Sequence, residues 1–319
     1  MPTTGFAANA VPGRRSGIKD TAMMLIGYAL HPLQTRRWLQ YINSVPALRE
    51  MARTAPALRT RLHQPYLSPG LSCADRVGVL MEHYDVLLHS PLADVARKAA
   101  LQPLSLGEFV GRSGTVYQLA LSAGDASRRD GDLVLRLHSR GLCIYTAAFV
   151  LLRRDGIRHV KLGGLQGMLA TDRSMGIKQI TRDLYGCRPR ELMIAIVREI
   201  GRAAECSKLI LISNANKLPP TDKHVCRKSS DYDAIWKEMH AARRSDGDFE
   251  LPCTDEAMVR MSEAAASRRA MLIESVLDLV RLRLAQDRAA AAWKAASQAS
   301  EPPLTPGMLR RSDIGNSAS

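Results

Sequence analysis

A series of short apolar runs in the middle of the chain, joined by very short turns, restricts its fold more than any other feature of the sequence. Four runs of seven to eleven residues occupy 115–122, 132–138, 142–152 and 158–165. Turn residues such as Asp130-Gly131 and Asp155-Gly156 separate them. Because strands joined by tight turns run antiparallel, the sequence predicts an antiparallel meander, with the uniformly apolar 142–152 run as its central strand.

Helical periodicity replaces this pattern in the first third of the chain. Prolines at 32, 46 and 56 interrupt residues 19–62, which predicts several short helices rather than one long helix. Residues 71–102 form a second helical block, with His83 and its acidic neighbours expected on the polar side. A histidine beside a carboxylate can act as a general base; the alternative is a solvated helix face.

After the strands the pattern is helical again. Helices are predicted over 175–185, 189–205, 232–242 and 254–297. The run 208–213 has the composition of a strand. Because a helical crossover leads to it, we expect it to lie parallel to an earlier strand.

These patterns predict an α+β fold: a basic helical N-terminal part, a central and mostly antiparallel sheet with helices, and a C-terminal helix. The length of 319 residues is near the limit of about 250–300 at which a single core stops growing. The predicted parts are a flexible tail (1–17), a basic helical region (18–106), a central α+β domain (107–253), a C-terminal helix (254–299) and a disordered tail (300–319).

The chain carries a net charge of +14, which favours anionic partners. Half of this excess lies in the first 65 residues, which hold nine Lys or Arg and only Asp20 and Glu50 as acids. The expected partner is an anionic lipid or a phosphorylated small ligand. Nucleic acid is not expected, because no recognition motif is present and aromatic residues make up only 5%.

Two aromatic residues, Trp38 and Tyr41, lie beside Arg36 and Arg37 in this basic region. Aromatic rings prefer the membrane interface and arginines pair with phosphate, so the arrangement fits a face that docks on anionic lipid. The alternative is a helical unit with a solvated basic face and both aromatic side chains in its core.

The apolar segment 21–30 follows several basic residues, as the core of a signal peptide does. Asp20 precedes it directly, and His31-Pro32 stands where small residues would mark a cleavage site. We therefore interpret it as the start of a helix, with a signal peptide as the alternative. No segment approaches the roughly 20 apolar residues that span a bilayer.

Six cysteines are too sparse for a disulfide scaffold, and no Cys-x-x-Cys occurs. Cys143 and Cys206 are predicted to be buried thiols. The closest group of possible metal ligands is His224 and Cys226, which Cys253 could join. Zinc sites usually have two pairs of ligands close together in the sequence, and the second pair is missing here, so no metal site is predicted. Reduced cysteines fit a cytoplasmic protein, at most peripheral to the inner membrane.

Most of the residues that could bind a ligand lie between positions 161 and 190. Glycines around Gln166 leave backbone N–H groups uncovered that can bind phosphate, and nearby cations include Lys178 and Arg182, four residues apart on one helix. The alternative is that the glycines serve close packing and the cations are solvated. Asn214 could anchor a substrate, and Tyr232 and Trp236 could line a pocket or belong to the core. The candidate ligand-binding residues are Gly163, Gly164, Gln166, Gly167, Lys178, Arg182, Arg188, Arg190, Asn214, Tyr232 and Trp236.

Several short motifs occur in a distinctive order. They are Gly-Gly-Leu-Gln-Gly at 163–167, Leu-Tyr-Gly-Cys-Arg-Pro-Arg at 184–190, Ile-Ser-Asn at 212–214, Tyr-Asp at 232–233 with Trp236, and Phe-Glu-Leu-Pro at 249–252. Over residues 75–285 this series resembles the VirK/YbjX family of Gram-negative bacterial proteins. The chain departs from the family pattern at Asp130-Gly131, where the family usually has Glu-Gly, and at 239–242, where the family has Glu and a pair of glycines.

The resemblance implies a role in virulence, in resistance to cationic antimicrobial peptides and in the placement of surface proteins, with membrane association in some members. It implies no defined reaction, so whether the chain is an enzyme stays open. One hypothesis is therefore a peripheral inner-membrane protein of envelope maintenance that binds an anionic ligand.

The alternative hypothesis is an acyltransferase that uses CoA or acyl-CoA. It rests on a fold-level analogy, because an antiparallel meander followed by a glycine-rich strand end, a helix and a parallel strand also builds the N-acyltransferase fold. In that fold the CoA pyrophosphate rests on backbone amides after the corresponding strand.

Overall fold

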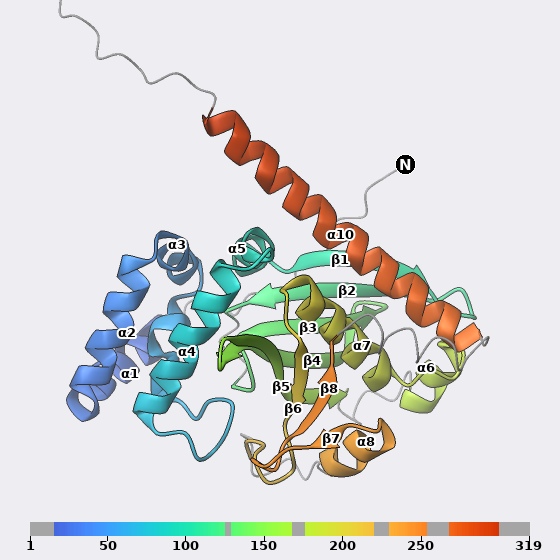
Figure 1. The fold of residues 1–319 in the computed structure, drawn as a ribbon, viewed down its shortest axis with the longest axis horizontal. Helices are drawn as coiled ribbons and strands as arrows, with labels where there is room; N and C mark the ends of the chain where they lie inside the picture. The colour runs from blue at the N-terminus through green and yellow to red at the C-terminus, as the bar shows by residue number, and fades with distance from the viewer. Residues whose placement is uncertain (1–15, 125–128, 168–175, 220–229, 254–267, 300–319) are drawn as a thin grey trace, which may run out of the picture.

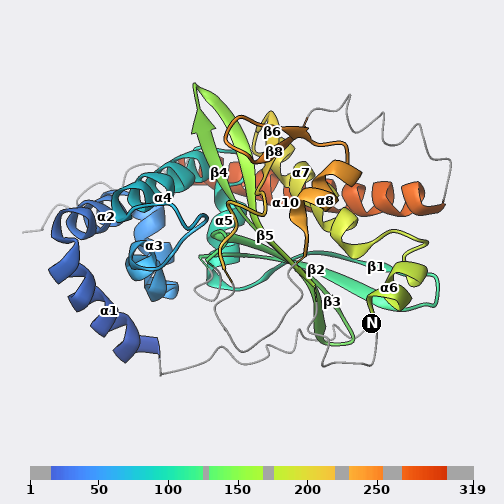
Figure 2. The same cartoon turned by 90° about the horizontal axis from the view of Figure 1, so that it is seen from below.

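The computed structural model describes residues 16–124, 129–167, 176–219, 230–253 and 268–299. The helices of the first third gather at one end of a large sheet (Figures 1 and 2). They are α1 (Ser16–Leu30), α2 (Pro32–Ser44), α3 (Pro46–Thr54), the 3₁₀ helix η1 (Pro56–His63), α4 (Cys73–Leu88) and α5 (Ala93–Leu101).

Local sequence signals account for where these helices begin. Pro32, Pro46 and Pro56 each occupy the first turn of a helix, where the missing N–H costs no hydrogen bond. At the start of α4, Ser72 and Asp75 form a reciprocal capping box. The predicted division of residues 19–62 into short helices is therefore confirmed.

The sheet has eight strands in the order β1-β2-β3-β4-β5-β6-β8-β7. The strands are β1 (Leu104–Val110), β2 (Val116–Ala123), β3 (Leu133–Ser139), β4 (Leu142–Arg154), β5 (Ile157–Gly167), β6 (Lys208–Leu211), β7 (Ala242–Arg243) and β8 (Phe249–Pro252). Neighbouring strands are antiparallel except for β5 and β6, which are parallel. The antiparallel meander and the parallel placement of the 208–213 run are thus confirmed.

Two helices form the crossover between the parallel strands: α6 (Ile177–Asp183) and α7 (Pro189–Ala203). The apolar stripe of α7 packs on β3, β4, β5 and β6. β4 also contacts α4, and its residues from Ala147 to Leu151 are fully buried, as expected for a central strand.

Two helices complete the fold, α8 (Tyr232–Glu238) and α10 (Arg268–Ala299). α10 packs on α7, α5 and β1, and its last turns extend past the body of the molecule (Figure 1). The predicted α+β class, with a mostly antiparallel sheet and a C-terminal helix, is confirmed. The strands β1, β7 and β8 were not predicted, and residues 254–267 of the expected C-terminal helix lie outside the described residues.

The expected polar position of His83 is wrong. The His83 side chain is fully buried, and its Nδ1 accepts a hydrogen bond of 3.0 Å from the backbone N–H of Leu151 in β4. Because α4 packs on β4, one flank of the apparent polar face of α4 is covered. This histidine is therefore part of the core.

Within the described part of the chain, no helix is both long and apolar enough to cross a bilayer.

Candidate functional site

α8 fills the place where the two parallel strands separate. β5 pairs with β6 only from His159 to Leu162, and then continues alone on that side to Gly167. There the Tyr232 hydroxyl accepts a hydrogen bond from the N–H of Leu165 at 2.8 Å and donates one to its carbonyl at 2.9 Å. The hydroxyl thus replaces a neighbouring strand at this point.

The other two candidate residues near α8 also make structural contacts. Trp236 is fully buried, and its indole N–H donates to the carbonyl of Ile212 at 2.7 Å. The Asn214 side-chain carbonyl accepts from the N–H of Tyr232 at 2.9 Å, and its amide donates to Asp231, the N-cap of α8, at 2.6 Å. These bonds fix α8 against the ends of β5 and β6.

The glycines of the 163–167 motif do not form an open cradle at their first two positions. Gly163 and Gly164 are buried. A Cβ at Gly163 would lie 2.0 Å from the carbonyl oxygen of Asp130, and a Cβ at Gly164 would lie 2.5 Å from the Asp130 carboxylate. An anion placed here would meet that carboxylate. The geometry therefore assigns these two glycines to close packing between β5 and the segment before β3.

The end of the motif is more open. Gln166 and Gly167 are half-buried, and a Cβ at Gly167 would lie 3.0 Å from the ring of Tyr145 and 3.7 Å from Ile177 at the start of α6. Lys178 and Arg182 are exposed on α6 and form no ion pair with any described residue. The backbone amides that an acyl-CoA pyrophosphate would need after β5 belong to residues 168–175, outside the described part.

Arg188 and Arg190 meet over a single carboxylate, that of Glu238 at the end of α8. Arg188 pairs with one oxygen and Arg190 with the other, the latter at 2.5 Å. The Nε of Arg190 is buried without a hydrogen-bond partner. Two guanidinium groups on one carboxylate leave one net positive charge beside the end of β5.

The structure thus brings together the 163–167 motif, Asn214, Tyr232 and Trp236 through direct bonds. Arg188 and Arg190 join this group through Glu238. No bond between the group and Lys178 or Arg182 is seen among the described residues, although Ile177 at the start of α6 approaches Gly167. The shared role of the candidate residues in binding a ligand stays a prediction.

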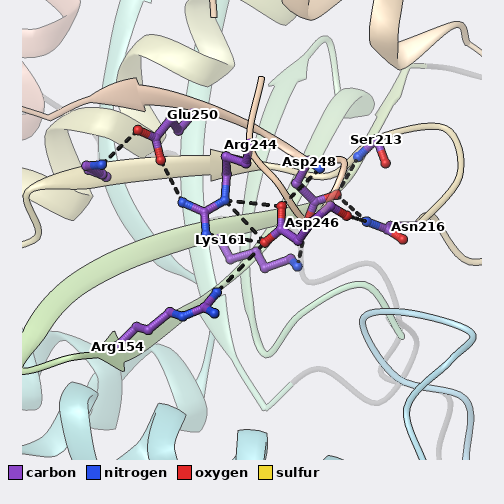
Figure 3. Close-up of polar contacts among 9 residues, drawn as sticks. Arg154, Lys161, Ser213, Asn216, Arg244, Asp246, Asp248 and Glu250 are labelled. Carbon is purple, nitrogen blue, oxygen red and sulfur yellow. Dashed lines mark hydrogen bonds and ion pairs between the residues drawn. The ribbon is translucent and has the colours of Figure 1, made fainter. Parts of the chain in front are cut away.

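A second polar cluster lies around the β7–β8 hairpin and was not predicted (Figure 3). Its centre is the buried carboxylate of Asp248, which accepts hydrogen bonds from Lys161 of β5 at 2.8 Å, from the N–H of Ser213 at 2.9 Å and from the Asn216 amide at 2.8 Å. Burial alone would raise the pKa of Asp248, but these donors outweigh it and lower the pKa. With both oxygens bonded, Asp248 is a structural carboxylate that ties the hairpin to the sheet.

Half-buried and exposed ion pairs surround this carboxylate (Figure 3). Arg244 bonds to Glu250 at 2.6 Å and to Asp246 at 3.2 Å, and Glu250 also pairs with Lys208 at 2.7 Å. Arg154 of β4 lies 4.0 Å from Asp246. The pattern Asp246-Gly247-Asp248 marks a turn in the sequence, but the partners come from distant strands, so sequence alone gave no sign of the cluster.

An open pocket of about 440 Å³ lies elsewhere, between the β1–β2 and β3–β4 turns. Its lining includes Ser113, Thr115 and Arg140. None of the candidate ligand-binding residues lines it.

The cysteines only partly follow expectation. Cys206 and Cys253 are buried, and burial raises the pKa of each thiol to about 12. Cys143, expected to be buried, is exposed because its end of β4 reaches past the covered part of the sheet. His224 and Cys226 lie outside the described residues, and those described include no group of three or more possible metal ligands.

The clearest surface feature is an apolar face on α1 and the start of α2, which we call the α1–α2 face. Its large side chains are strongly exposed; they are Leu25 (68%), Ile26 (58%), Tyr28 (43%), Leu30 (68%) and Leu33 (75%). Arg36 and Arg37 are exposed on the next turn, and residues 22–44 contain no acidic residue. Several large apolar side chains that are strongly exposed and close together in the chain are typical of an interaction site.

The two aromatic residues expected near lipid are not part of this face. Trp38 is fully buried and donates to the carbonyl of Leu58 at 3.0 Å, and half-buried Tyr41 donates to the carbonyl of Met81 at 3.1 Å. The alternative that placed both rings in the helical core is therefore correct. α1 and α2 lie at the opposite end of the molecule from α6 (Figures 1 and 2).

The fold and these surfaces define an α+β protein with a mixed eight-stranded sheet and an exposed apolar and basic helical face. A family model described as "Protein of unknown function (DUF535)" matches residues 14–273, and the chain belongs to this family. The chain is 24% identical over 251 residues to the "Uncharacterized protein YbjX" of Escherichia coli (strain K12), across 77% of this chain and 76% of that protein. The resemblance to the VirK/YbjX family is thus confirmed.

Among solved structures, the chain is similar to two variants of a cAMP-binding acyltransferase from Mycobacterium smegmatis. The TM-scores are 0.30 and 0.29, each with 13% sequence identity over 64% of this chain. The matches span 65% and 64% of the acyltransferase chains. Similarity at this level carries no argument about fold or function.

Proposed function

We propose that the chain is a peripheral membrane protein that docks on an anionic bilayer through the α1–α2 face. The observation that carries this proposal is the exposure of five large apolar side chains beside Arg36 and Arg37, in a stretch without acidic residues. Apolar side chains enter the interfacial zone of a bilayer while adjacent arginines bind lipid phosphate. In this way the protein would serve the envelope role that the family resemblance implies.

Charge favours a bilayer over a protein partner. A basic face without acidic residues complements a uniformly anionic surface. Each apolar side chain that leaves water contributes roughly 1.5–3 kcal/mol, and each arginine near an anionic surface contributes about 1 kcal/mol. The apolar contribution is thus the larger one, and salt should weaken binding without abolishing it.

Co-sedimentation with vesicles tests the proposal. We expect binding to vesicles that contain phosphatidylglycerol, weaker binding in high salt, and similarly weakened but measurable binding to pure phosphatidylcholine. Leu25→Gln with Leu30→Gln should reduce binding more than Arg36→Gln with Arg37→Gln. Leu282→Gln on α10 is the matched control, since Leu282 is 62% exposed but lies far from α1. Equal binding by the Leu25/Leu30 variant and the wild type would refute the assignment of this face.

A second part of the proposal concerns the end of β5, where a small phosphorylated ligand would bind to Arg188 and Arg190. The supporting observation is that both guanidinium groups share the single carboxylate of Glu238. A phosphate group can replace a carboxylate as a bidentate partner of arginine. Titration with pyrophosphate should shift the NMR signals of both arginines, and Arg190→Gln should abolish the shift; unchanged arginine signals in the wild type would refute it.

A further inference from the structure

α1 rests on the ring of a histidine. Of residues 22 and 24–30, only Gly27 is buried. A Cβ at Gly27 would lie 2.1 Å from Nε2 and 2.2 Å from Cε1 of His63 in η1, so the helix backbone is in direct contact with the imidazole. The absence of a side chain at Gly27 is what allows this approach.

The surroundings of His63 suit a neutral ring. Its Nδ1 is buried without a hydrogen-bond partner. Its Nε2 lies 3.5 Å from the hydroxyl of Thr35. That hydroxyl donates its hydrogen bond to the carbonyl of His31, at 2.8 Å. Protonation would place a second N–H inside a site that offers no good acceptor for it.

The charged groups near His63 oppose its protonation as well. His31 lies at the junction of α1 and α2, and Arg76 approaches from α4, held by hydrogen bonds of 2.9 Å to the carbonyls of Leu62 and Gln64. Burial, followed by these two basic groups, lowers the pKa of His63 below 6.5. No carboxylate of the described residues is among the groups that shift the pKa of His63. α1 also contains Asp20, whose side chain lies outside the described part.

We propose that His63 is a proton-operated latch for α1: the neutral ring seats the helix, and protonation releases it onto the bilayer. The proposal rests on membrane docking through the α1–α2 face. Once α1 leaves, water contacts the edge of the ring and can solvate the protonated form. Burial by α1 then no longer opposes protonation of His63. By linkage, acid must then favour the released state, with a tenfold shift of the equilibrium for each unit by which seating lowers the pKa.

An anionic bilayer would assist this release. Its surface potential concentrates protons about threefold near the headgroups. Proximity to the membrane therefore favours protonation of His63, and release of α1 in turn frees the rest of its apolar surface for the interface. Docking and protonation reinforce each other.

Two measurements on the full chain test the latch without lipid. In NMR titration between about pH 7.5 and about pH 5.5, His63 should titrate below its ordinary value, and hydrogen exchange at residues 24–30, corrected for intrinsic rates, should accelerate as the pH falls. His63→Gln should remove this acceleration, whereas the exposed control His89→Gln should keep it. Gly27→Ala should lift α1 from the ring and raise the pKa of His63 toward its ordinary value, because burial is the largest cause of the lowered pKa.

A parallel series with phosphatidylglycerol vesicles separates the latch from the docking proposal. Stronger binding at acidic pH in the wild type, absent in His63→Gln, would support both. Exchange at residues 24–30 that does not change with pH would overturn the latch and leave docking intact. Acid-dependent exchange without vesicle binding at any pH would refute docking while the latch stands.

Discussion

The Arg61 guanidinium donates two hydrogen bonds to one carboxylate oxygen of Asp132, at 3.0 and 2.7 Å, and both side chains are almost completely buried. The Tyr66 hydroxyl donates to the other oxygen at 2.7 Å. Asp132 directly precedes β3, and Arg61 belongs to η1. The helical N-terminal part and the sheet are therefore joined through a buried polar contact inside one continuous core.

Removing one partner of this pair should be costly, because the other charge stays buried. We expect Arg61→Met to lower the free energy of unfolding by roughly 3–5 kcal/mol, measured by urea denaturation. The control is Glu205→Gln, which removes an exposed pair with Arg158 and should cost less than about 1 kcal/mol. Equal losses in the two variants would contradict the structural role of the buried pair.

The packing role of Gly163 predicts a clear contrast with another glycine. Gly163→Ala should destabilise the protein by about 1–3 kcal/mol or more, because the new methyl group would meet the carbonyl of Asp130. Gly78 lies inside α4 with no heavy atom near the added Cβ, so Gly78→Ala should stabilise by roughly 0.5–1 kcal/mol. Thermal unfolding of both variants measures the contrast, and a neutral Gly163→Ala would show that β5 is not closely packed there.

The bonds between Tyr232 and Leu165 predict the effect of removing one hydroxyl. Tyr232→Phe leaves the N–H and the carbonyl of Leu165 without this partner, at a cost of roughly 1–3 kcal/mol. Hydrogen exchange at Leu165 should accelerate. Tyr28→Phe, at an exposed position, is the control and should change neither quantity. An unchanged exchange rate in Tyr232→Phe would mean that water substitutes fully for the hydroxyl.

Burial of His83 predicts acid sensitivity. Burial lowers the pKa of His83 from 6.5 to about 4, so below pH 6.5 the unfolded chain binds more protons than the folded one. Stability is full above this pH and declines as the pH falls toward 4, by on the order of 3 kcal/mol for this group. His83→Gln retains an acceptor for the N–H of Leu151 without titrating, and should flatten the decline. Equal slopes in both proteins would contradict a buried, neutral His83.

Most of the architecture was predictable because its signals are local. The prolines at 32, 46 and 56 mark helix starts through the geometry of one residue, and the turns of the meander carry glycine or aspartate at fixed places. The strand β1 was not predicted because Gly107 interrupts it. The strands β7 and β8 were not predicted because two and four residues are too few to show an alternation of apolar and polar residues.

The candidate site was less predictable because its geometry depends on contacts between distant segments. The glycines of the 163–167 motif are evident in the sequence, but nothing in it shows that Asp130 covers the first two. The same holds for Tyr232, whose hydroxyl reaches β5 only because α8 fills the gap beside β6. The apolar run at 21–30 was visible, yet its exposure depends on Gly27 being the contact point with η1.

The most direct test of membrane docking places a fluorescent probe on the α1–α2 face. In a background with Cys143→Ser and Cys226→Ser, Leu30→Cys carries an environment-sensitive dye, and Leu282→Cys on α10 is the matched control. With phosphatidylglycerol vesicles, we predict a blue shift and quenching by brominated lipid at position 30 and neither effect at position 282. Vesicle binding with an unshifted probe at position 30 would show that the protein docks through another surface and would contradict the account.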